Sequence, residues 1–576
     1  MQESIIRFSD FTWQYESQAE PTLRGLSFDI KKGEKVLICG PSGCGKSTIS
    51  HCLNGLIPFS YRGKMTGSLS ICGKETKDLS IFDLSKMVGT VLQDSDGQFV
   101  GLTVAEDIAF ALENDCVPQK DLIARVNSTS QKVDTQKLLS AAPHELSGGQ
   151  KQRVSLAGVM VDDVPILLFD EPLANLDPAT GKHSIELIDE IQKQSGATVI
   201  IIEHRLEDVL WKSVDRILLM GDGVLLADMK PSELLCTDLL KQNGIREPLY
   251  ITALKYAGVQ ITQEMHPESI NTLCLNQEEK SKLQNWFNTI DSENNDNDNP
   301  VQLSLDNINF SYEKRGRVLS DISFDIRRGE MLSIVGKNGA GKSTLSKLIC
   351  GFIKPESGTM NFLLDGNMHS LSEYSIKERA DHIGYVMQNP NQMISKIMIS
   401  EEVALGLVTR NVDEQTIKQR VDDTLKICGL YSFRNWPISA LSYGQKKRVT
   451  IASILALNPE IIILDEPTAG QDYRHYTDIM EFLKELNERG VTVILITHDM
   501  HLMMEYCKRS IVITDGKIIA DTSPAQVLTN KELVEKAYLK ETSLYELSHL
   551  CGIDDGCAFT QRFIDYERRL RGGQNG

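Results

Sequence analysis

Four short motifs occur twice in this chain, in the same order and about 295 residues apart. Four pairs in one order at one offset do not arise by chance, so the 576 residues hold two copies of one structural unit. A chain of this length also exceeds the ~100–200 residues that usually share one core. The pairs are GPSGCGKST (40–48) and GKNGAGKST (336–344), LSGGQKQRV (146–154) and LSYGQKKRV (441–449), ILLFDEP (166–172) and IIILDEP (461–467), and VIIIEH (199–204) and VILITH (493–498).

A polar segment separates the two copies. Residues 291–300 read DSENNDNDNP, which is acidic, lacks apolar periodicity and ends in a proline, as is typical of a solvated linker. We therefore predict a first domain over 1–290 and a second over 301–576. Each ends in a segment with a helical pattern, at 245–290 and 531–576.

The order of apolar and helical patterns predicts the fold class. In each copy, apolar β-branched strands alternate with helical patterns, such as 183–194 and 477–490, and this alternation predicts an α/β fold with a parallel sheet. Each copy opens with a β-rich segment, FSDFTWQY or LDNINFSY, which we assign to a separate antiparallel element. The pattern of 103–145 indicates a smaller helical subdomain.

Composition excludes several classes of protein. The net charge of -18 disfavours general binding to nucleic acid, because an acidic surface repels a phosphate backbone. The 12 cysteines form no CxxC pair, so a zinc ribbon, an iron–sulfur domain or a disulfide framework is not expected. No stretch approaches the ~20 apolar residues of a membrane span, and the N-terminus lacks the apolar run of a signal peptide.

Both glycine-rich motifs fit the phosphate-binding pattern G-x-x-x-x-G-K-[ST] between an apolar strand and a helix. Backbone N–H groups of such a loop wrap around phosphates, and the helix points its positive end at them. A chance glycine-rich turn would not be expected twice in this context. Lys46 and Lys342 would reach the β- and γ-phosphates, and Ser47 and Ser343 would bind Mg²⁺. The predicted loop residues are Gly40, Pro41, Ser42, Gly43, Cys44, Gly45, Lys46, Ser47 and Thr48, and Gly336, Lys337, Asn338, Gly339, Ala340, Gly341, Lys342, Ser343 and Thr344.

Two carboxylates end an apolar strand in each copy. Asp170 and Asp465 stand where a strand delivers a Mg²⁺-organising carboxylate beside the phosphate loop. Glu171 and Glu466 follow, and each can polarise a water for in-line attack on the γ-phosphate. Exposed acids at a strand end are the ordinary alternative. The matched spacing to the phosphate loop in both copies favours the catalytic interpretation.

His204 and His498 each end another apolar strand, and Gln93 and Gln388 follow the strands GTVLQ and GYVMQ. A histidine in this place is often structural. Its recurrence favours a γ-phosphate sensor that steadies the transition state. The glutamines could ligate Mg²⁺ and orient the attacking water, or they could be ordinary polar loop residues.

The motifs LSGGQ and LSYGQ each precede a basic helical pattern. Ser147 and Ser442 can cap that helix, and the same N-terminus can also bind an anion. Each copy already has a phosphate loop, so a second anion site is surplus unless it serves the other copy. This argument predicts a head-to-tail pair with nucleotides between the copies.

Together these motifs resemble the ABC-type ATPases over nearly the whole chain. The resemblance implies a RecA-like α/β core with a helical subdomain in each unit, ATP and Mg²⁺ as ligands, and two composite sites. The first would combine Lys46, Ser47, Gln93, Asp170, Glu171 and His204 with Ser442 and Gly444, and the second would combine Lys342, Ser343, Gln388, Asp465, Glu466 and His498 with Ser147 and Gly149.

The resemblance also leaves some points open. Tyr15 and Tyr312 stand where the family stacks an aromatic ring on adenine, but core packing is an alternative for both. Tyr443 replaces the first glycine of the second signature, and the D-loop AGQDYRHY differs from ANLDPATG. We expect two working sites, with unequal rates possible. Cys44 occupies the position that Ala340 has in the second copy. It is either a reactive thiol in a positive field or a small buried residue.

Finer features resemble the ATPases of energy-coupling factor (ECF) importers. The resemblance implies a peripheral subunit at the cytoplasmic face of the cell membrane. Its partners would be a transmembrane coupling subunit and a small solute-binding membrane subunit, with no nucleic acid, and its solute a vitamin or vitamin precursor. The segments 94–99 and 389–393 would receive the coupling subunit, flanked by the acids Glu106, Asp107, Glu401 and Glu402. The similar segments are 93–114, 201–209, 244–258 and 466–472.

A twin-cassette ATPase of translation or DNA repair is the alternative function. The translation type carries a long charged helical linker, whereas the linker here is short, acidic and rich in asparagine. The repair type carries CxxC pairs, which this sequence lacks. Only 101 residues separate Lys46 from Ser147, which leaves no room for the long coiled coils of the chromosome-maintenance type.

Overall fold

The computed structural model describes residues 3–92, 95–174, 176–290, 299–313, 316–468 and 473–573. Contacts divide the chain into two compact units, and each is described by itself. The first comprises Met1–Trp286 together with Asp472–Arg474, and the second comprises the remainder. The predicted linker lies almost wholly in 291–298, outside the described residues, so the domain boundaries at 290 and 301 stay a prediction.

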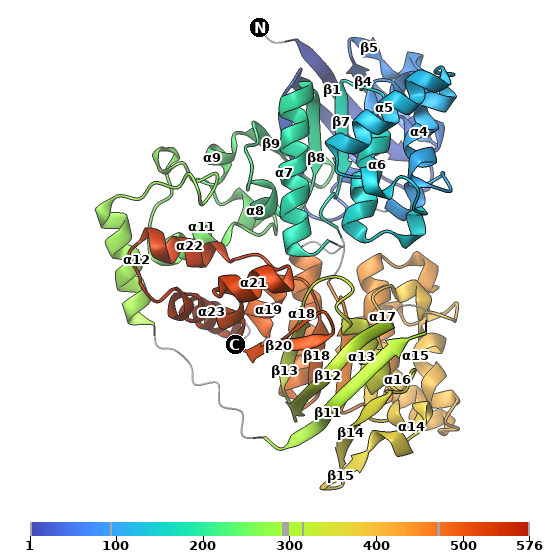
Figure 1. The fold of residues 1–576 in the computed structure, drawn as a ribbon, viewed down its shortest axis with the longest axis vertical. Coiled ribbons are helices and arrows are strands. Elements are labelled where there is room, and N and C mark those ends of the chain that lie inside the picture. The colour runs from blue at the N-terminus through green and yellow to red at the C-terminus, as the bar shows by residue number, and fades with distance from the viewer. Residues whose placement is uncertain are drawn as a thin grey trace. The chain divides into compact units, whose positions relative to one another are not determined.

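A six-stranded sheet forms the centre of the first unit (Figure 1). Neighbouring strands from β9 to β6 run parallel, and only β10 at the edge is antiparallel. The inner strands are entirely buried because their residues are almost all aliphatic, as parallel strands covered on both faces require. In spatial order the strands are β10 (Val224–Met229), β9 (Arg216–Gly221), β3 (Lys35–Cys39), β8 (Thr198–Ile202), β7 (Ile166–Asp170) and β6 (Val88–Val91).

A second, antiparallel sheet covers part of this core. Its strands alternate buried and exposed residues, which gives one apolar face, and Phe8 stacks on Phe28 across that face with ring centroids 4.6 Å apart. The apolar face joins Trp13, Ile38 and Leu168 in one hydrophobic cluster. In spatial order the strands are β2 (Leu23–Lys31), β1 (Ser4–Tyr15), β4 (Gly63–Ile71) and β5 (Lys74–Glu75).

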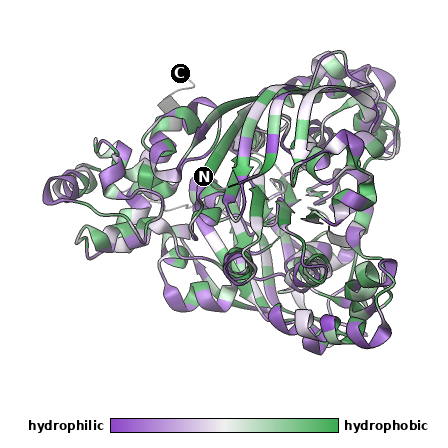
Figure 2. Ribbon diagram, turned by 90° about the horizontal axis from the view of Figure 1, so that it is seen from above, coloured by the Kyte–Doolittle hydropathy of each residue, from purple (hydrophilic) through white to green (hydrophobic). Residues whose placement is uncertain are grey.

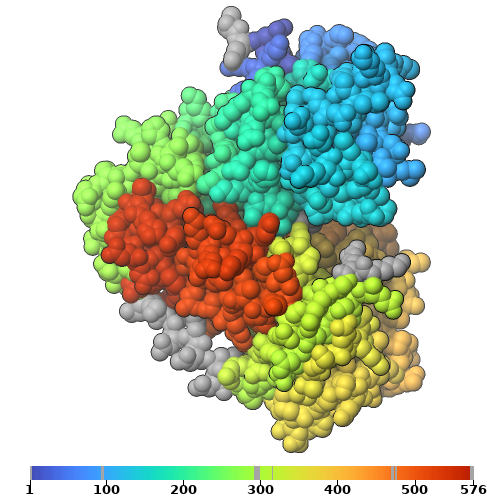
Figure 3. Space-filling model, in the orientation of Figure 1, coloured from blue at the N-terminus to red at the C-terminus, as the bar shows by residue number. Residues whose placement is uncertain are grey.

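Helices complete the first unit. Three of them, α4 (Val104–Asn114), α5 (Gln119–Lys132) and α6 (Gly148–Met160), pack on one another as a helical subdomain, which confirms the helical prediction for this part of the chain. They form a continuous stretch of surface, drawn in blue and cyan in Figure 3. The long helix α7 (Pro178–Ser195) lies along the central sheet (Figure 1). The remaining short helices are α1 (Lys46–Leu53), α2 (Leu56–Phe59), α3 (Ile81–Ser85), α8 (Leu206–Val209), α9 (Pro231–Leu234) and α10 (Leu239–Gln242).

The second unit repeats this architecture, so the predicted duplication and the α/β class are confirmed. Its central sheet has the order β16 (Ile383–Val386), β17 (Ile461–Asp465), β18 (Thr492–Ile496), β13 (Met331–Val335), β19 (Arg509–Thr514) and β20 (Lys517–Thr522). Its antiparallel sheet has the order β12 (Gly316–Arg327), β11 (Val301–Tyr312), β14 (Ser357–Leu364) and β15 (Asn367–Ser370). Its helices are α13 (Lys342–Ile349), α14 (Ile376–Arg379), α15 (Ile399–Val408), α16 (Glu414–Ile427), α17 (Tyr443–Leu455), α18 (Tyr473–Glu488), α19 (Met500–Tyr506) and α20 (Pro524–Leu528).

Helical segments follow the α/β core of each unit, as the sequence predicts. The stretch between the first two of these helices, 257–276, contains only the short turn Gln263–Met265, so the helical prediction for 245–290 holds only towards its ends. Hydrophobic residues gather on strands, and hydrophilic ones on outer turns of helices (Figure 2). Within the described ranges, no helix has the length and apolar character to cross a bilayer. The helices are α11 (Leu249–Tyr256) and α12 (Gln277–Thr289), then α21 (Lys531–Ala537), α22 (Ser543–Leu550) and α23 (Gly556–Gly573).

Candidate nucleotide sites

Each phosphate loop joins a buried central strand to the helix that follows it. In the first unit the chain passes from β3 to α1, and Gly45 caps the helix with a φ of 103°. A Cβ at Gly45 would lie 2.6 Å from a methyl group of Leu23, so both the backbone and the packing require glycine there. Gly341 repeats this conformation in the second unit, with a φ of 104°.

The lysine of each loop folds back over the loop's own carbonyl groups. Lys46 Nζ donates to the carbonyl oxygens of Gly40 at 2.8 Å and Pro41 at 2.9 Å. Lys342 Nζ likewise donates to the carbonyl oxygen of Gly336 at 2.6 Å. Both side chains are buried. The loop therefore holds a positive charge at its centre, where an anionic phosphate would be stabilised.

Carboxylate and hydroxyl oxygens converge beside the second phosphate loop. Asp465, at the end of β17, accepts hydrogen bonds through Oδ2 from Ser343 Oγ at 2.9 Å and from the Tyr385 hydroxyl at 3.1 Å. Burial raises the pKa of Asp465, and the Ser343 hydrogen bond opposes that rise. Oxygen ligands of this kind suit Mg²⁺. In the first unit Asp170 is also buried, and burial raises its pKa.

Both predicted catalytic glutamates have a left-handed backbone, with φ values of 48° at Glu171 and 47° at Glu466. Their N–H groups donate to the carbonyl oxygens of Ile202 at 2.9 Å and Ile496 at 2.8 Å, so the neighbouring strand holds this conformation. Non-glycine residues with such a backbone are concentrated at functional sites. Burial, followed by the nearby charge of Glu203, raises the pKa of Glu171 to about 7.

The two predicted γ-phosphate sensors, His204 and His498, have different carboxylate neighbours and are called the switch histidines below. His498 Nδ1 lies 2.7 Å from Glu466 Oε1, so the structure brings these two predicted site residues together. His204 Nδ1 lies 3.2 Å from Oε1 of Glu203, the residue before it. Gln93 lies outside the described residues.

The signature serines Ser147 and Ser442 directly precede helices α6 and α17, and the capping prediction is confirmed for Ser442, whose Oγ accepts the backbone N–H of Gln445 at 3.3 Å. The backbone N–H of Ser147 donates to Gln150 Oε1 at 2.9 Å, and that of Ser442 donates to Gln445 Oε1 at 3.0 Å. We call the segments that begin at Gln93 and Gln388 the Q-loops. Tyr443 contacts the Q-loop of its own unit, because its hydroxyl donates to the carbonyl oxygen of Gln388 at 3.3 Å. The role of Ser147, Gly149, Ser442 and Gly444 toward the nucleotide of the other copy stays a prediction.

The two candidate adenine-stacking residues pack against the core. Tyr15 is half-buried, its hydroxyl lies 3.2 Å from Thr48 Oγ1, and its ring meets Trp13 edge-on at 5.7 Å. Tyr312 meets Phe310 edge-on at 4.8 Å. Both rings therefore have a packing role, and stacking on adenine stays a prediction.

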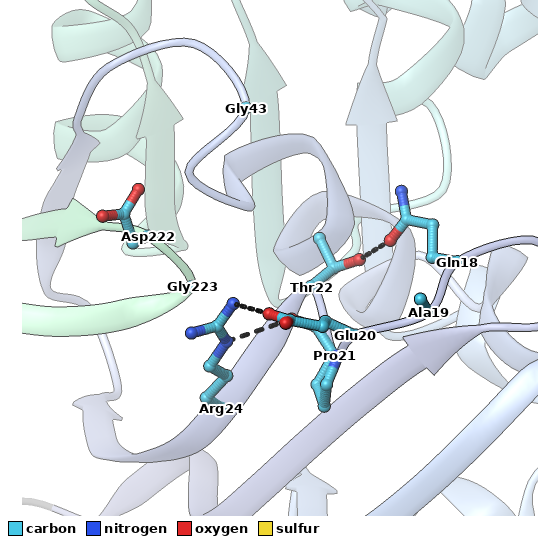
Figure 4. A pocket seen from close by; sticks show the side chains of 9 residues that line it. All are labelled: Gln18, Ala19, Glu20, Pro21, Thr22, Arg24, Gly43, Asp222 and Gly223. Carbon is cyan, nitrogen blue, oxygen red and sulfur yellow. Dashed lines mark hydrogen bonds and ion pairs between the residues drawn. The ribbon is translucent and has the colours of Figure 1, made fainter.

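A polar hollow of about 510 Å³ adjoins the first phosphate loop (Figure 4). Gly43 of the loop lies at one side of it. Two hydrogen-bonded pairs lie in its wall: Thr22 Oγ1 donates to Gln18 Oε1 at 2.5 Å, and Arg24 donates to Glu20 Oε2 at 3.1 Å. The lining residues are Gln18, Ala19, Glu20, Pro21, Thr22, Arg24, Gly43, Asp222 and Gly223.

Three of the four acids that flank the Q-loops accept backbone N–H groups of nearby loops. Glu402 is buried, and its Oε2 accepts backbone N–H groups from Ser395 at 2.9 Å and Lys396 at 2.7 Å. Asp107 Oδ1 accepts the N–H of Val100 at 2.8 Å, among others. Glu106 belongs to the cap of α4. These three carboxylates therefore bind loop backbone. Glu402 is buried and Asp107 partly buried, whereas Glu106 and Glu401 remain exposed.

Cys44 is 2% exposed and belongs to the hydrophobic cluster of the first unit. Its Sγ lies 3.9 Å from Lys46 Nζ. The two alternatives from the sequence were a reactive thiol and a buried small residue. The burial supports the second, because a reagent must reach the sulfur before the charge of Lys46 can favour its reaction.

Two residues beside the candidate sites, Lys447 and Glu203, were not predicted from the sequence. Lys447 is buried and donates to the carbonyl oxygens of Met387, Gln388 and Glu466. Glu203 is fully buried beside Glu171. The signal for both was a difference between the repeats, since Gln152 replaces the lysine in the first copy and Thr497 replaces the glutamate in the second.

A phosphate loop, a strand-end carboxylate pair and a strand-end histidine at one edge of a central sheet, with a capped signature helix, define an ATPase of the ABC type. A family model described as ABC transporter matches residues 23–174 and 319–469. A second, described as ATP-binding cassette cobalt transporter, matches residues 237–310.

Related proteins match nearly the whole chain. A protein named as an ABC transporter ATP-binding protein in Clostridium perfringens is 59% identical over 569 residues, 99% of both chains. One from Enterococcus faecalis is 56% identical over 574 residues, 100% of both chains. The solved cbiO1 of C. perfringens, part of the ABC transporter complex cbiONQ, is 36% identical, with 41% of this chain and 94% of that chain covered and a TM-score of 0.38. The chain therefore belongs to the ABC transporter ATP-binding proteins, which bind ATP and are ATPases coupled to transport.

Proposed function

We propose that this chain is the energy-coupling ATPase of an ECF-type importer and drives uptake of a small solute through partner membrane subunits. The main support is that each unit carries a phosphate-loop lysine, a strand-end carboxylate pair and a strand-end histidine at the same edge of its own parallel sheet. The match of 237–310 to a family described as cobalt transporter ATPases supports the ECF type. The chain would lie at the cytoplasmic face of the membrane and contact it only through its partners.

In each unit, the phosphate-loop lysine would hold the β- and γ-phosphates of ATP, and Glu171 or Glu466 would accept a proton from the attacking water. The signature serine and second glycine of the other unit would complete each site. Mg²⁺, when bound, would neutralise phosphate charge. Its ligands would be Ser47, Asp170 and Gln93 in the first unit, and Ser343, Asp465 and Gln388 in the second.

Exposed apolar side chains support a docking surface for a membrane partner. Leu102 and Ile397 occupy equivalent positions after the two Q-loops and are 83% and 75% exposed. Burying such side chains against another protein is favourable. A hollow of about 330 Å³ lies beside Ile397, lined also by Asn391, Ile394, Lys396, Ile438, Ser439 and Lys446.

The solute belongs to the partner subunits, and two classes are candidates. The sequence resemblance favours a vitamin or vitamin precursor, and the family description of 237–310 favours a metal cation of the cobalt type. Extracting the purified complex for organic mass spectrometry and for elemental analysis separates the two.

Isolation of the chain from native membranes tests the proposal. We expect two integral membrane proteins to copurify, one of them small, and a Leu102→Asp/Ile397→Asp double variant to lose them while it retains ATP binding. Exposed Leu226→Asp, outside both Q-loop regions, serves as the matched control. Recovery of the chain with ribosomes or DNA, and without membrane proteins, would instead support the translation or repair alternative.

A further inference from the structure

Glu203 is a fully buried carboxylate at the end of β8, directly before the switch histidine of the first unit. Its Oε1 accepts the backbone N–H groups of His204 at 2.9 Å and Arg205 at 3.2 Å. Its Oε2 accepts the N–H of Leu173 at 3.2 Å. A buried charge is costly unless hydrogen bonds compensate it, and three N–H donors supply that compensation.

Leu173 is held a second time from the same loop. The guanidinium of Arg205 donates to its carbonyl oxygen, so Glu203 and Arg205 bind both backbone polar groups of this residue. Leu173 is buried and lies two residues after Glu171. The loop that carries the switch histidine is therefore fastened to the segment that carries the catalytic glutamate.

The same carboxylate also orients the histidine ring. His204 Nδ1 lies 3.2 Å from Glu203 Oε1. A carboxylate at this distance favours the proton on Nδ1 and fixes which ring nitrogen, Nε2, is left for another partner. Within the first unit, one buried side chain thus holds the switch ring, its loop and the segment after the general base.

In the second unit, different residues hold the switch histidine. Thr497 and Asp499 replace the glutamate and the arginine, and His498 Nδ1 lies 2.7 Å from Oε1 of Glu466 itself. Thr497 Oγ1 donates to Glu466 Oε2 at 3.4 Å. There, the carboxylate that would act as general base also holds the histidine.

We propose that Glu203 is a positioning residue that belongs to the first ATPase unit alone. It holds His204 and the segment after Glu171, whereas in the second unit the general base, Glu466, holds the histidine itself. The first unit then separates two tasks that Glu466 performs together in the second. Glu466 must release His498 and bind water before it can accept a proton, whereas Glu171 does not have to release His204. The inference rests on the proposed catalytic roles of Glu171 and Glu466 and is independent of the transported solute.

Imidazole nitrogen NMR of the full-length chain tests the proposal without requiring turnover. The His204 and His498 signals are assigned with His204→Gln and His498→Gln in ¹⁵N-histidine-labelled protein. We expect Glu203→Thr to shift the His204 signals and Glu171→Gln to leave them in place, while Glu466→Gln shifts those of His498. His204 signals that respond to Glu171→Gln and not to Glu203→Thr would overturn the proposal.

Kinetics supply the second measurement. In a Glu466→Gln background, hydrolysis reports on the first site, and we expect Glu203→Thr to lower kcat about tenfold or more with KM for ATP changed less than about twofold. Glu203→Gln, which keeps one oxygen acceptor, should recover part of the loss. Asp189→Asn is the matched control, because it removes another buried carboxylate charge of the first unit, one paired with Lys35 at 2.5 Å. An equal fall of kcat in that control at the same loss of Tm would show that Glu203 is merely structural.

If the double Glu171→Gln/Glu466→Gln variant retained full hydrolysis, the catalytic assignment would fail instead. The NMR comparison would still report whether Glu203 holds His204. The two failures are therefore distinguishable.

Discussion

Lys447 Nζ lies 2.7 Å from the carbonyl oxygen of Gln388 and 3.4 Å from that of Glu466. A third bond, to the carbonyl of Met387 at 3.1 Å, uses the last proton of the ammonium group. Burial lowers the pKa of Lys447 to about 8, against the opposing charges of Asp465 and Glu466. One buried cation thus connects the Q-loop of the second unit to the backbone of its catalytic glutamate.

Replacement of Lys447 by methionine should uncouple these two segments. Methionine keeps the apolar stem but leaves three carbonyl oxygens without this donor, a loss that costs about 1–3 kcal/mol for a buried polar group, so we also expect a lower Tm. We expect second-site turnover, measured in a Glu171→Gln background, to fall about tenfold, which corresponds to ~1.4 kcal/mol of activation free energy. Lys446→Met, at the neighbouring and partly exposed lysine, is the matched control. Unchanged turnover in Lys447→Met would exclude this role.

The two strand-end glutamates should account for hydrolysis. Glu171→Gln combined with Glu466→Gln keeps the side-chain volume but removes both proton acceptors, and loss of a general base costs ~10²–10⁴ in rate. We expect ATP binding to persist in a filter-binding assay while phosphate release becomes undetectable. Wild-type hydrolysis by the double variant would contradict the assignment.

Glu402 should support partner docking through the structure of its loop. Glu402→Gln keeps one acceptor for the N–H groups of Ser395 and Lys396 but loses the charge that strengthens both bonds. We expect weaker copurification of membrane partners, with ATP binding intact. Glu401→Gln, at the exposed neighbour, should have no effect. If the exposed variant lost the partners and the buried one did not, direct attraction by surface charge would be the better explanation.

Thiol reagents should report the burial of Cys44. Cys72, Cys116 and Cys274 are exposed, so we expect them to be alkylated first in the native chain. Peptide mapping should find Cys44 modified only after denaturation, and Cys44→Ala should leave turnover nearly unchanged. Rapid modification of Cys44 in the native chain, with protection by ATP, would restore the reactive-thiol hypothesis.

The buried pair of Lys35 and Asp189 should contribute to acid stability. Burial favours the neutral acid, but hydrogen bonds from Lys193 and Lys35 outweigh it, so the pKa of Asp189 lies below its usual value. A depressed carboxyl pKa stabilises the folded state above the unfolded pKa of ~3.9 and loses that contribution as pH falls. Denaturant titrations from pH 6 to pH 3 should therefore show a smaller loss of unfolding free energy in Asp189→Asn than in the wild type. Parallel curves would contradict this expectation.

The sequence by itself determined the duplication, the α/β class and most of the site. Phosphate loops, strand-end carboxylates and capped helices depend on residues that are close along the chain, so motifs such as 40–48 and 166–172 predict their local structure directly. The periods of apolar residues predicted the sheets and the helical subdomain for the same reason.

Tertiary structure decided which partner each polar side chain has. Lys447 reads as an ordinary basic helix residue, and only the packing of α17 against the Q-loop buries it among three carbonyl oxygens. The sequence pattern around Glu402 predicts a surface acid, but in the folded chain its carboxylate accepts the backbone N–H groups of residues 395–396. Likewise, spacing predicts both switch histidines alike, but His204 faces Glu203 and His498 faces Glu466. Burial and hydrogen-bond partners arise from segments distant in sequence, and a local pattern carries no record of them.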